Sequence, residues 1–417
     1  MKLKLAVLIS MLLFCSAAVF AQNSSGNDLS KTVAKYDSLL MKAYEARDIS
    51  TFAKNFDVLL KFYYTLPVAE QKNYKQALAS AYYNFACTYA LVGEKTKSLA
   101  CLDKAVENGF FNYSHMMKDS DLNILHDEKR FAEITGKIRS IGDFLYILKR
   151  ADKFNNKDER PLPEFKYQAA ENPNLAELRK AFKLDSIAGT GNEISKILNL
   201  MHWIHNLVEH DGSNGNPVVK NALSMINECK TGKRGLNCRG LAIVLNECYL
   251  SMGIKSRFVT CLPKDSLKVD NDCHVINMVY SESLKKWLWI DPTFDAYVIN
   301  ENGELLSIEE VRERVINGKM LILNPDANWN KRTSQTKENY LYTYMAKNLY
   351  MLECPVSSEY NLETRENGKV TEYIRLLPLD YFDQKPDVQT SENKDFNSKT
   401  TTYVTNNAEY FWKVPAK

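Results

Sequence analysis

The stretch Cys238-Arg-Gly-Leu-Ala-Ile-Val-Leu-Asn-Glu-Cys-Tyr-Leu-Ser-Met-Gly253 decides the fold. Its residues are mostly apolar, and the run stops at a glycine, the residue expected just past the C-terminus of a helix. We therefore predict a buried helix that begins at Cys238. A thiol at a helix start gains thiolate character, because unpaired backbone N–H groups and the positive end of the helix dipole stabilise the S⁻ form.

Two strand-like segments follow this helix. The first is Cys-His274-Val-Ile-Asn-Met-Val-Tyr280, and the second, Lys-Trp-Leu-Trp-Ile-Asp291, ends just before a proline. Both are rich in β-branched and aromatic residues, and a polar turn separates them. An antiparallel pair would place Asp291 beside His274, so that the carboxylate binds one imidazole nitrogen and the other nitrogen faces a thiol. We therefore predict that Cys238, His274 and Asp291 act as nucleophile, base and orienting group.

The chain resembles the transglutaminase-like superfamily over roughly residues 195–295. The family's core helix carries Cys, then Ala, Gly-Ile and Arg at fixed spacings, and its later strands carry His and Trp-x-x-x-Asp-Pro-Thr. Here these positions hold Cys238, Ala242, Gly253, Ile254, Arg257, His274, Trp287, Asp291, Pro292 and Thr293. One feature departs from the family pattern: a Trp usually follows the His closely, whereas Val275, Ile276 and Asn277 stand here.

The resemblance implies an α+β protein with a papain-like catalytic core at residues 164–300. It also implies acyl transfer, in which Cys238 attacks an amide carbonyl of a peptide or protein, His274 moves the proton and Asp291 orients His274. No metal or organic cofactor is implied. Hydrolysis is favoured, because bacterial members of the superfamily commonly resemble peptidases. The alternatives are a true transamidase and a non-enzymatic binding scaffold with a decayed catalytic fold, against which the presence of all three residues argues.

Taken alone, each of these three residues can be explained by a structural role. A helical cysteine is more often a small buried hydrophobe, which we expect of Cys229, Cys248 and Cys261. A strand histidine is usually structural, and an aspartate before proline can simply form a turn. The three residues together, in this order and in these settings, favour the catalytic interpretation.

The preceding segment, Glu193–His210, has the pattern of a helix with three histidines. His202 and His205 share a face, but their spacing matches no zinc signature, so packing or cleft lining is the better interpretation. Trp203 and Asn206 are both candidates to reach the active site from this helix.

The N-terminus has the pattern of a secretory signal peptide, residues 1–21. Lys2 and Lys4 precede an apolar run, and Val19-Phe-Ala21 forms a small-x-small cleavage site before Gln22. Cys15 offers a lipoprotein alternative, which is less favoured because the bulky Phe14 precedes it. We therefore expect a periplasmic or secreted bacterial protein.

The composition excludes some classes of protein. The formal net charge is +3, with both signs mixed along the chain and no basic stripe, so nucleic-acid binding is not indicated. No later window is apolar enough for a membrane span. Of the nine cysteines, eight lie beyond the signal, and their pairing cannot be read from spacing. A nucleophilic Cys238 must stay unpaired.

Residues 22–150 have helical periodicity almost throughout. One stretch resembles a tetratricopeptide repeat, with small residues where two helices would approach and a glycine in the turn between them. The matching positions are Tyr82, Phe85, Ala86, Tyr89, Gly93, Ser98, Leu102 and Ala105. The region is interpreted either as a peptide-binding groove for a protein partner or as a helical bundle that merely packs on the catalytic domain.

Beyond a polar, proline-bearing linker at 153–163, the C-terminal third is mixed. Residues 301–417 are predicted to form a β-rich extension, with strands within 369–378 and 399–405. Glu338–Leu352 is predicted to be a helix that carries an aromatic run including Tyr340 and Tyr344. The extension is interpreted as an accessory sheet, with a sugar or peptide site as the alternative.

Overall fold

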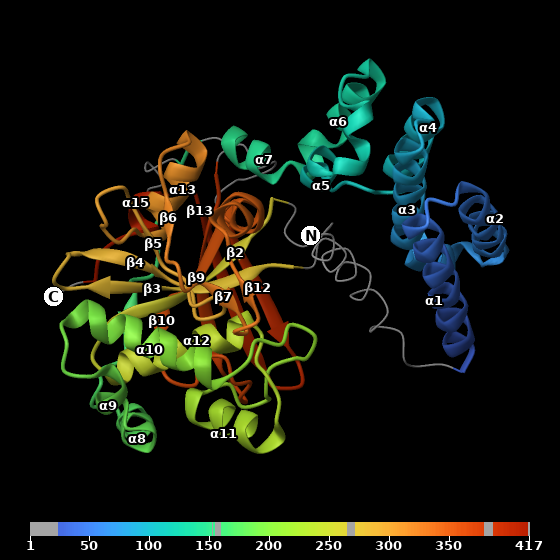
Figure 1. Cartoon of the computed structure of the whole chain (residues 1–417). Helices are drawn as coiled ribbons and strands as arrows, with labels where there is room; N and C mark the ends of the chain where they lie inside the picture. The colour runs from blue at the N-terminus through green and yellow to red at the C-terminus, as the bar shows by residue number, and fades with distance from the viewer. Residues whose placement is uncertain (1–23, 152, 155–159, 265–271, 379–386, 416–417) are drawn as a thin grey trace. The chain divides into compact units, whose positions relative to one another are not determined.

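The computed structural model of the chain describes residues 24–151, 153–154, 160–264, 272–378 and 387–415 (Figure 1). The expected signal peptide and its cleavage site lie outside the described residues. The chain divides between Asp143 and Phe144 into two compact units. In the described part of the chain, no helix combines the length and the apolar character needed to cross a membrane.

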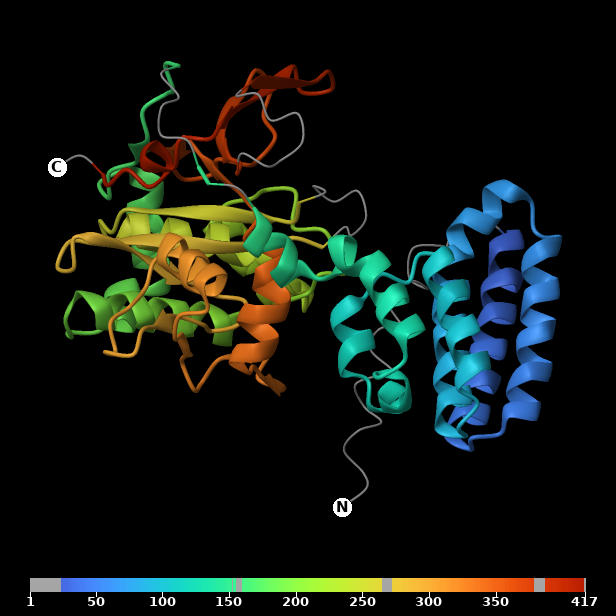
Figure 2. The ribbon, with the colours of Figure 1, turned by 90° about the horizontal axis from the view of Figure 1, so that it is seen from above.

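The first unit is helical, as the periodicity predicts, and its helices lie side by side in Figure 2. Gly93, with φ +85°, turns the chain between the third and fourth helices. Ser98 is buried and its hydroxyl donates to the carbonyl oxygen of Ala86 at 2.7 Å, so these two helices approach closely at small residues. The helices are α1 (Ser24–Glu45), α2 (Ile49–Thr65), α3 (Val68–Leu91), α4 (Lys95–Glu107), α5 (Tyr113–Lys118), η1 (Ser120–Leu125) and α6 (Lys129–Gly142).

The second unit is built on a seven-stranded sheet of order β12-β13-β11-β9-β2-β3-β4. All neighbouring strands are antiparallel except β11 and β13. Residues of the expected core and of the expected extension therefore share one sheet, and the C-terminal region is rich in strands as predicted. The strands are β2 (Ser256–Leu262), β3 (His274–Ser281), β4 (Lys286–Ile290), β9 (Met351–Pro355), β11 (Val370–Leu376), β12 (Val388–Asn393) and β13 (Ser398–Thr405).

Smaller elements complete this unit. Three two-stranded pairs join β1 (Lys166–Tyr167) to β10 (Ser357–Ser358), β5 (Val298–Ile299) to β6 (Ile322–Leu323), and β7 (Asn328–Trp329) to β8 (Thr333–Ser334). The helices are α7 (Phe144–Arg150), α8 (Pro173–Phe182), α9 (Leu184–Ala188), α10 (Glu193–Leu207), α11 (Ala222–Gly232), α12 (Cys238–Ser251), α13 (Ile308–Asn317), the π-helical η2 (Glu338–Met345), α14 (Ala346–Asn348) and α15 (Ala408–Phe411).

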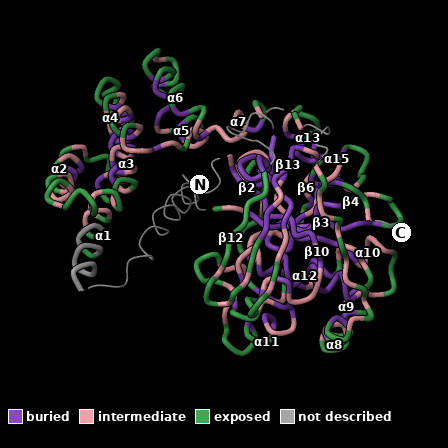
Figure 3. The backbone as a smooth tube through the Cα atoms, turned by 180° about the vertical axis from the view of Figure 1, so that it is seen from behind, coloured by how far each residue is buried: buried purple, intermediate pink, exposed green. Residues whose placement is uncertain are grey.

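The sheet lies between two apolar clusters. On one face, Phe258, Val275 and Val279 pack against α12 and the helices around it. On the other, Ile276, Met278 and Ile374 pack against residues of α13, η2 and α15. In Figure 3 the central strands and much of α12 have the colour of buried residues.

The predicted helix at Cys238 is confirmed as α12. Every residue from Gly240 to Ser251 is buried, and Gly253 (φ +74°) follows its end. The prediction of one helix over Glu338–Leu352 is wrong at its C-terminal end, because Met351 and Leu352 pair with β2 as part of β9. Sheet pairing there outweighs the helical periodicity of the preceding residues.

Candidate active site

Cys238 is the first residue of α12, and side-chain amides hold the turn before it. Asn237 caps the helix by accepting from the Gly240 backbone N–H at 3.1 Å. Asn216 in turn donates to the Asn237 side chain at 2.7 Å and accepts from the Asn237 backbone N–H at 3.1 Å. A side-chain carbon at Gly240 would lie 2.5 Å from the Asn216 amide oxygen, so only glycine leaves room for this support.

His274 and Asp291 meet as the two predicted strands imply. β3 pairs with β4 so that Asn277 is opposite Ile290, which places the next residue, Asp291, towards His274. Nε2 of His274 lies 2.7 Å from Oδ2 of Asp291, and both side chains are almost completely buried. Nδ1 of His274, also buried, makes no hydrogen bond to a nitrogen or oxygen atom of the described residues, and is therefore available to the thiol.

The carboxylate of Asp291 is held by further donors. Oδ1 accepts from the backbone N–H groups of Thr293 at 2.9 Å and Phe294 at 3.3 Å. Oδ2 accepts from the Tyr340 hydroxyl at 2.5 Å, in addition to the imidazole. These donors satisfy both oxygen atoms of the buried carboxylate and hold it in place. Sequence reasoning missed the role of Tyr340, because it lies far along the chain on η2 and belongs to no recognisable motif.

The electrostatics of the site favour a thiolate–imidazolium pair. Burial lowers the pKa of His274, but the charge of Asp291 and its hydrogen bond outweigh burial and raise that pKa to about 10. Burial alone would raise the pKa of Cys238, yet hydrogen bonds from His210 and His274 and the charge of His274 lower it to about 6. Between these values, the thiol is ionised and the imidazole protonated.

His210 is the second imidazole beside Cys238. The expected helix through residue 210 ends at Leu207, and the chain then forms a bridge in which His210 is opposite Leu236, two residues before the nucleophile. The indole N–H of Trp329 donates to Nδ1 of His210 at 3.2 Å. Because an indole can only donate, Nδ1 is the acceptor and the proton of a neutral ring is on Nε2.

The other residues of α10 have structural contacts. His202 is paired with Asp295 at 2.6 Å, and His205 is buried between the carbonyl oxygen of Pro292 and the side chain of Asn328. Trp203 packs against Phe182, and Asn206 donates to a backbone carbonyl of its own helix. The expectation that Trp203 or Asn206 reaches the site gains no support from these contacts, and His210 reaches it instead.

We expect His210→Gln to raise the pKa of Cys238 by about one to two units, because a hydrogen bond to a charged group is worth about 1.5–3 kcal/mol. The midpoint of the rise in alkylation rate with pH should move upward by that amount. His205→Gln is the matched control, since His205 is a buried imidazole that contacts Pro292 and Asn328. An unshifted midpoint in His210→Gln would remove His210 from the thiolate environment.

The eight described cysteines are all free of disulfide bonds. Cys273 precedes His274, and its carbonyl oxygen lies 3.9 Å from Sγ of Cys238. Burial raises the pKa of the Cys273 thiol to about 11, so this neighbour stays protonated near neutral pH. Of these two thiols, Cys238 is therefore the one whose surroundings favour the thiolate.

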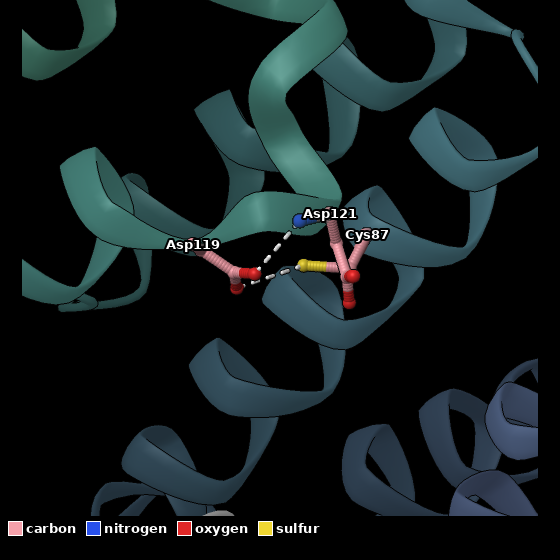
Figure 4. A group of neighbouring side chains, drawn as sticks. All are labelled: Cys87, Asp119 and Asp121. Atoms are coloured by element: carbon pink, nitrogen blue, oxygen red, sulfur yellow. Dashed lines mark hydrogen bonds between the residues drawn. The ribbon is translucent and has the colours of Figure 1, made fainter. Parts of the chain in front are cut away.

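One cluster in the first unit has metal-ligand residue types. Figure 4 shows Cys87 on α3 with Asp119 and Asp121 beside it, and their ligand atoms lie within 4.8 Å of one another. The Tyr83 hydroxyl donates to Asp119 at 2.7 Å, and the Tyr44 hydroxyl donates to Asp121. Burial raises the pKa of the Cys87 thiol well above its ordinary value. Protonated thiol and hydroxyl donors of this kind make a hydrogen-bonded network that joins η1 to α3.

Comparisons with known proteins bear on the second unit. Residues 180–292 match the model of the transglutaminase-like superfamily. A search of curated proteins finds no match. A solved structure from Cytophaga hutchinsonii, provisionally named a cysteine protease, is similar with 23% identity and a TM-score of 0.24, over 34% of this chain and 43% of that chain. The chain thus spans less than half of that protein, and the TM-score is too low to show a shared fold. On the family match, residues 180–292 form a transglutaminase-like domain, which is a cysteine-enzyme fold.

Proposed function

We propose that the protein is an exported bacterial cysteine hydrolase that cleaves amide bonds of peptides or proteins. The observation that supports this most directly is the position of Cys238 at the start of α12, beside a buried His274–Asp291 pair. Export is supported by the signal-like pattern of residues 1–21.

In the first step, the Cys238 thiolate attacks the amide carbonyl carbon and forms a C–S bond. The carbonyl electrons move to oxygen, and the negative charge is stabilised by the Cys238 backbone N–H, which as part of the first helical turn has no intrahelical acceptor. The Nε2–H of His210 is the second donor. The C–N bond then breaks as His274 passes its proton to the leaving amine.

In the second step, water attacks the thioester carbonyl while His274 accepts a proton from it. The C–S bond breaks and the carboxylic acid leaves, which restores the thiolate and the imidazolium. Asp291 keeps the imidazole oriented throughout, and the two backbone donors and Tyr340 keep Asp291 in place. An amine in place of water would instead give transamidation.

The first test uses p-nitrophenyl acetate, an activated ester that needs no knowledge of the natural substrate. We expect a stoichiometric burst of nitrophenol, an acetyl group on Cys238 detected by mass spectrometry, and its release by water. Cys238→Ala should show no burst, whereas Cys229→Ala, which removes a buried thiol of α11, should behave as the parent protein. Release that accelerates strongly with added primary amine, with the amine acetylated, would move the assignment to transamidation. Absence of any acetyl-enzyme would favour a non-enzymatic scaffold.

A further inference from the structure

A charged pocket lies beside the first turn of α12, next to the nucleophile. Its volume is about 450 Å³, within the range of small-ligand sites. It is lined by one face of the sheet, by Arg239 and by the segment around Glu363. Arg239 directly follows Cys238, so this part of the pocket wall adjoins the proposed nucleophile in the chain.

The sheet register explains why the pocket is polar. Thr260 is opposite Glu353, Glu353 is opposite Arg375, and Tyr373 is opposite Thr402, so these side chains lie on one face. On β2, Phe258 belongs to the same face and is covered by the α12 cluster. The α12 face of the sheet therefore continues, beyond the helix, as a surface of hydroxyl and charged side chains.

The floor of the pocket is electrically balanced. Arg239 pairs with Glu363 through Nε at 2.9 Å and Nη2 at 2.5 Å, and Tyr373 donates to the same carboxylate at 2.9 Å. Arg375 pairs with Glu353 at 2.6 Å. These ion pairs fix the shape of the floor and leave neither carboxylate without a cationic partner.

The rim, in contrast, carries more cations than carboxylates. Lys369 donates to the backbone carbonyl oxygens of Asn361 and Thr364, and it pairs with Glu366 at 3.7 Å. For Lys220, Arg365 and Lys399, no side-chain hydrogen bond or ion pair is present among the described residues. The charges of the two floor ion pairs cancel, so the rim cations give the lining a net positive charge. This charge attracts an anion.

We propose that this pocket binds a carboxylate of an acidic peptide, through the rim cations Lys220, Arg365 and Lys399. Because Arg239 lines the pocket and directly follows Cys238, we expect the bound carboxylate to belong to a residue close to the amide that Cys238 attacks. Because the pocket wall adjoins Cys238 in the chain, an acidic side chain of a peptide is the anion that we assign to it, and phosphate is the alternative that the experiment tests.

The assignment of this peptide as the substrate rests on the proposed function, but its binding does not. The experiment therefore uses the full mature chain with Cys238→Ala, which cannot form an acyl-enzyme. Hexaglutamate, hexaglutamine and inorganic phosphate are titrated by calorimetry at low and physiological salt. We expect hexaglutamate to bind, hexaglutamine not to bind, and the affinity for hexaglutamate to fall as salt screens the rim charges.

The decisive variant combines Lys220→Gln, Arg365→Gln and Lys399→Gln. It should weaken hexaglutamate binding by about tenfold or more, because three charges facing the ligand are lost. The matched control changes the same number of exposed cations of the second unit that line neither pocket, as Lys180→Gln, Lys319→Gln and Lys413→Gln, and should bind as the parent does.

Equal affinity of the triple variant and its control would overturn the proposal, as would equal binding of hexaglutamine and hexaglutamate. Phosphate that binds more tightly than hexaglutamate and depends on the same three residues would replace the acidic peptide by a phosphorylated ligand. None of these results depends on activity, so a protein that fails the acyl-enzyme test can still pass this one.

Discussion

Replacing His274 by Ala should slow the alkylation of Cys238 at pH 7 by about thirtyfold. In the parent protein the pKa of Cys238 is lowered to about 6, so most of the thiol is ionised at pH 7. Without the imidazolium, that pKa should return towards about 8.5, where only a few per cent is thiolate at pH 7. The measurement is the rate of reaction with iodoacetamide between pH 5 and 10, followed by mass spectrometry of the Cys238 peptide.

Cys101 provides an internal control in every sample. It is half-buried on α4, and burial raises the pKa of its thiol to about 11, so it should react mainly at alkaline pH in parent and variant alike. If the His274→Ala profile of Cys238 coincides with that of the parent, the two residues are not coupled and the proposed triad is wrong.

The same pKa shifts set the pH range of amide cleavage. Activity should rise as Cys238 ionises near pH 6 and fall as His274 loses its proton near pH 10, because the leaving amine needs that proton. Asp291 raises the pKa of His274, so its removal should move the upper limit to lower pH.

Asp291→Asn should lower the rate of acylation by about a thousandfold to ten-thousandfold, by analogy with Ser–His–Asp enzymes. The amide keeps the size of the carboxylate, but it lacks the charge that stabilises the imidazolium and favours the wrong imidazole tautomer. The measurement is the single-turnover burst with p-nitrophenyl acetate, together with its pH profile. Undiminished acylation would remove Asp291 from the mechanism.

Tyr340→Phe is the matched control for Asp291. It removes one hydrogen bond to the same oxygen, Oδ2, while the carboxylate and its contact with His274 remain. A hydrogen bond to a charged group is worth about 1.5–3 kcal/mol, so the loss should be about ten- to a hundredfold at most. An effect as large as that of Asp291→Asn would mean that Asp291 owes its position mainly to Tyr340.

Local sequence patterns were enough to predict the parts of the site that depend on short-range order. The apolar run and its closing glycine place Cys238 at a helix start. Two strands joined by a short turn pair with each other, and this pairing brings Asp291 next to His274. The helical first unit and the strands near the C-terminus follow from periodicity in the same way. The catalytic roles of these residues, the signal peptide and the domain limits at 164–300 and 301–417 remain predictions.

Contacts between distant segments were not predictable, because periodicity says which face a residue occupies but not which segment meets it. Tyr340 reaches Asp291 only because η2 packs across the sheet, and His210 reaches Cys238 only because α10 ends at Leu207 and the chain turns back to Leu236. The charged pocket likewise exists only because β9, β11 and β13 join β2. The sequence by itself determined the positions of Cys238 at a helix start and of His274 and Asp291 on neighbouring strands, which local hydrogen bonding and side-chain alternation specify. The tertiary structure alone decided what surrounds them, since that depends on how buried faces from remote parts of the chain pack together.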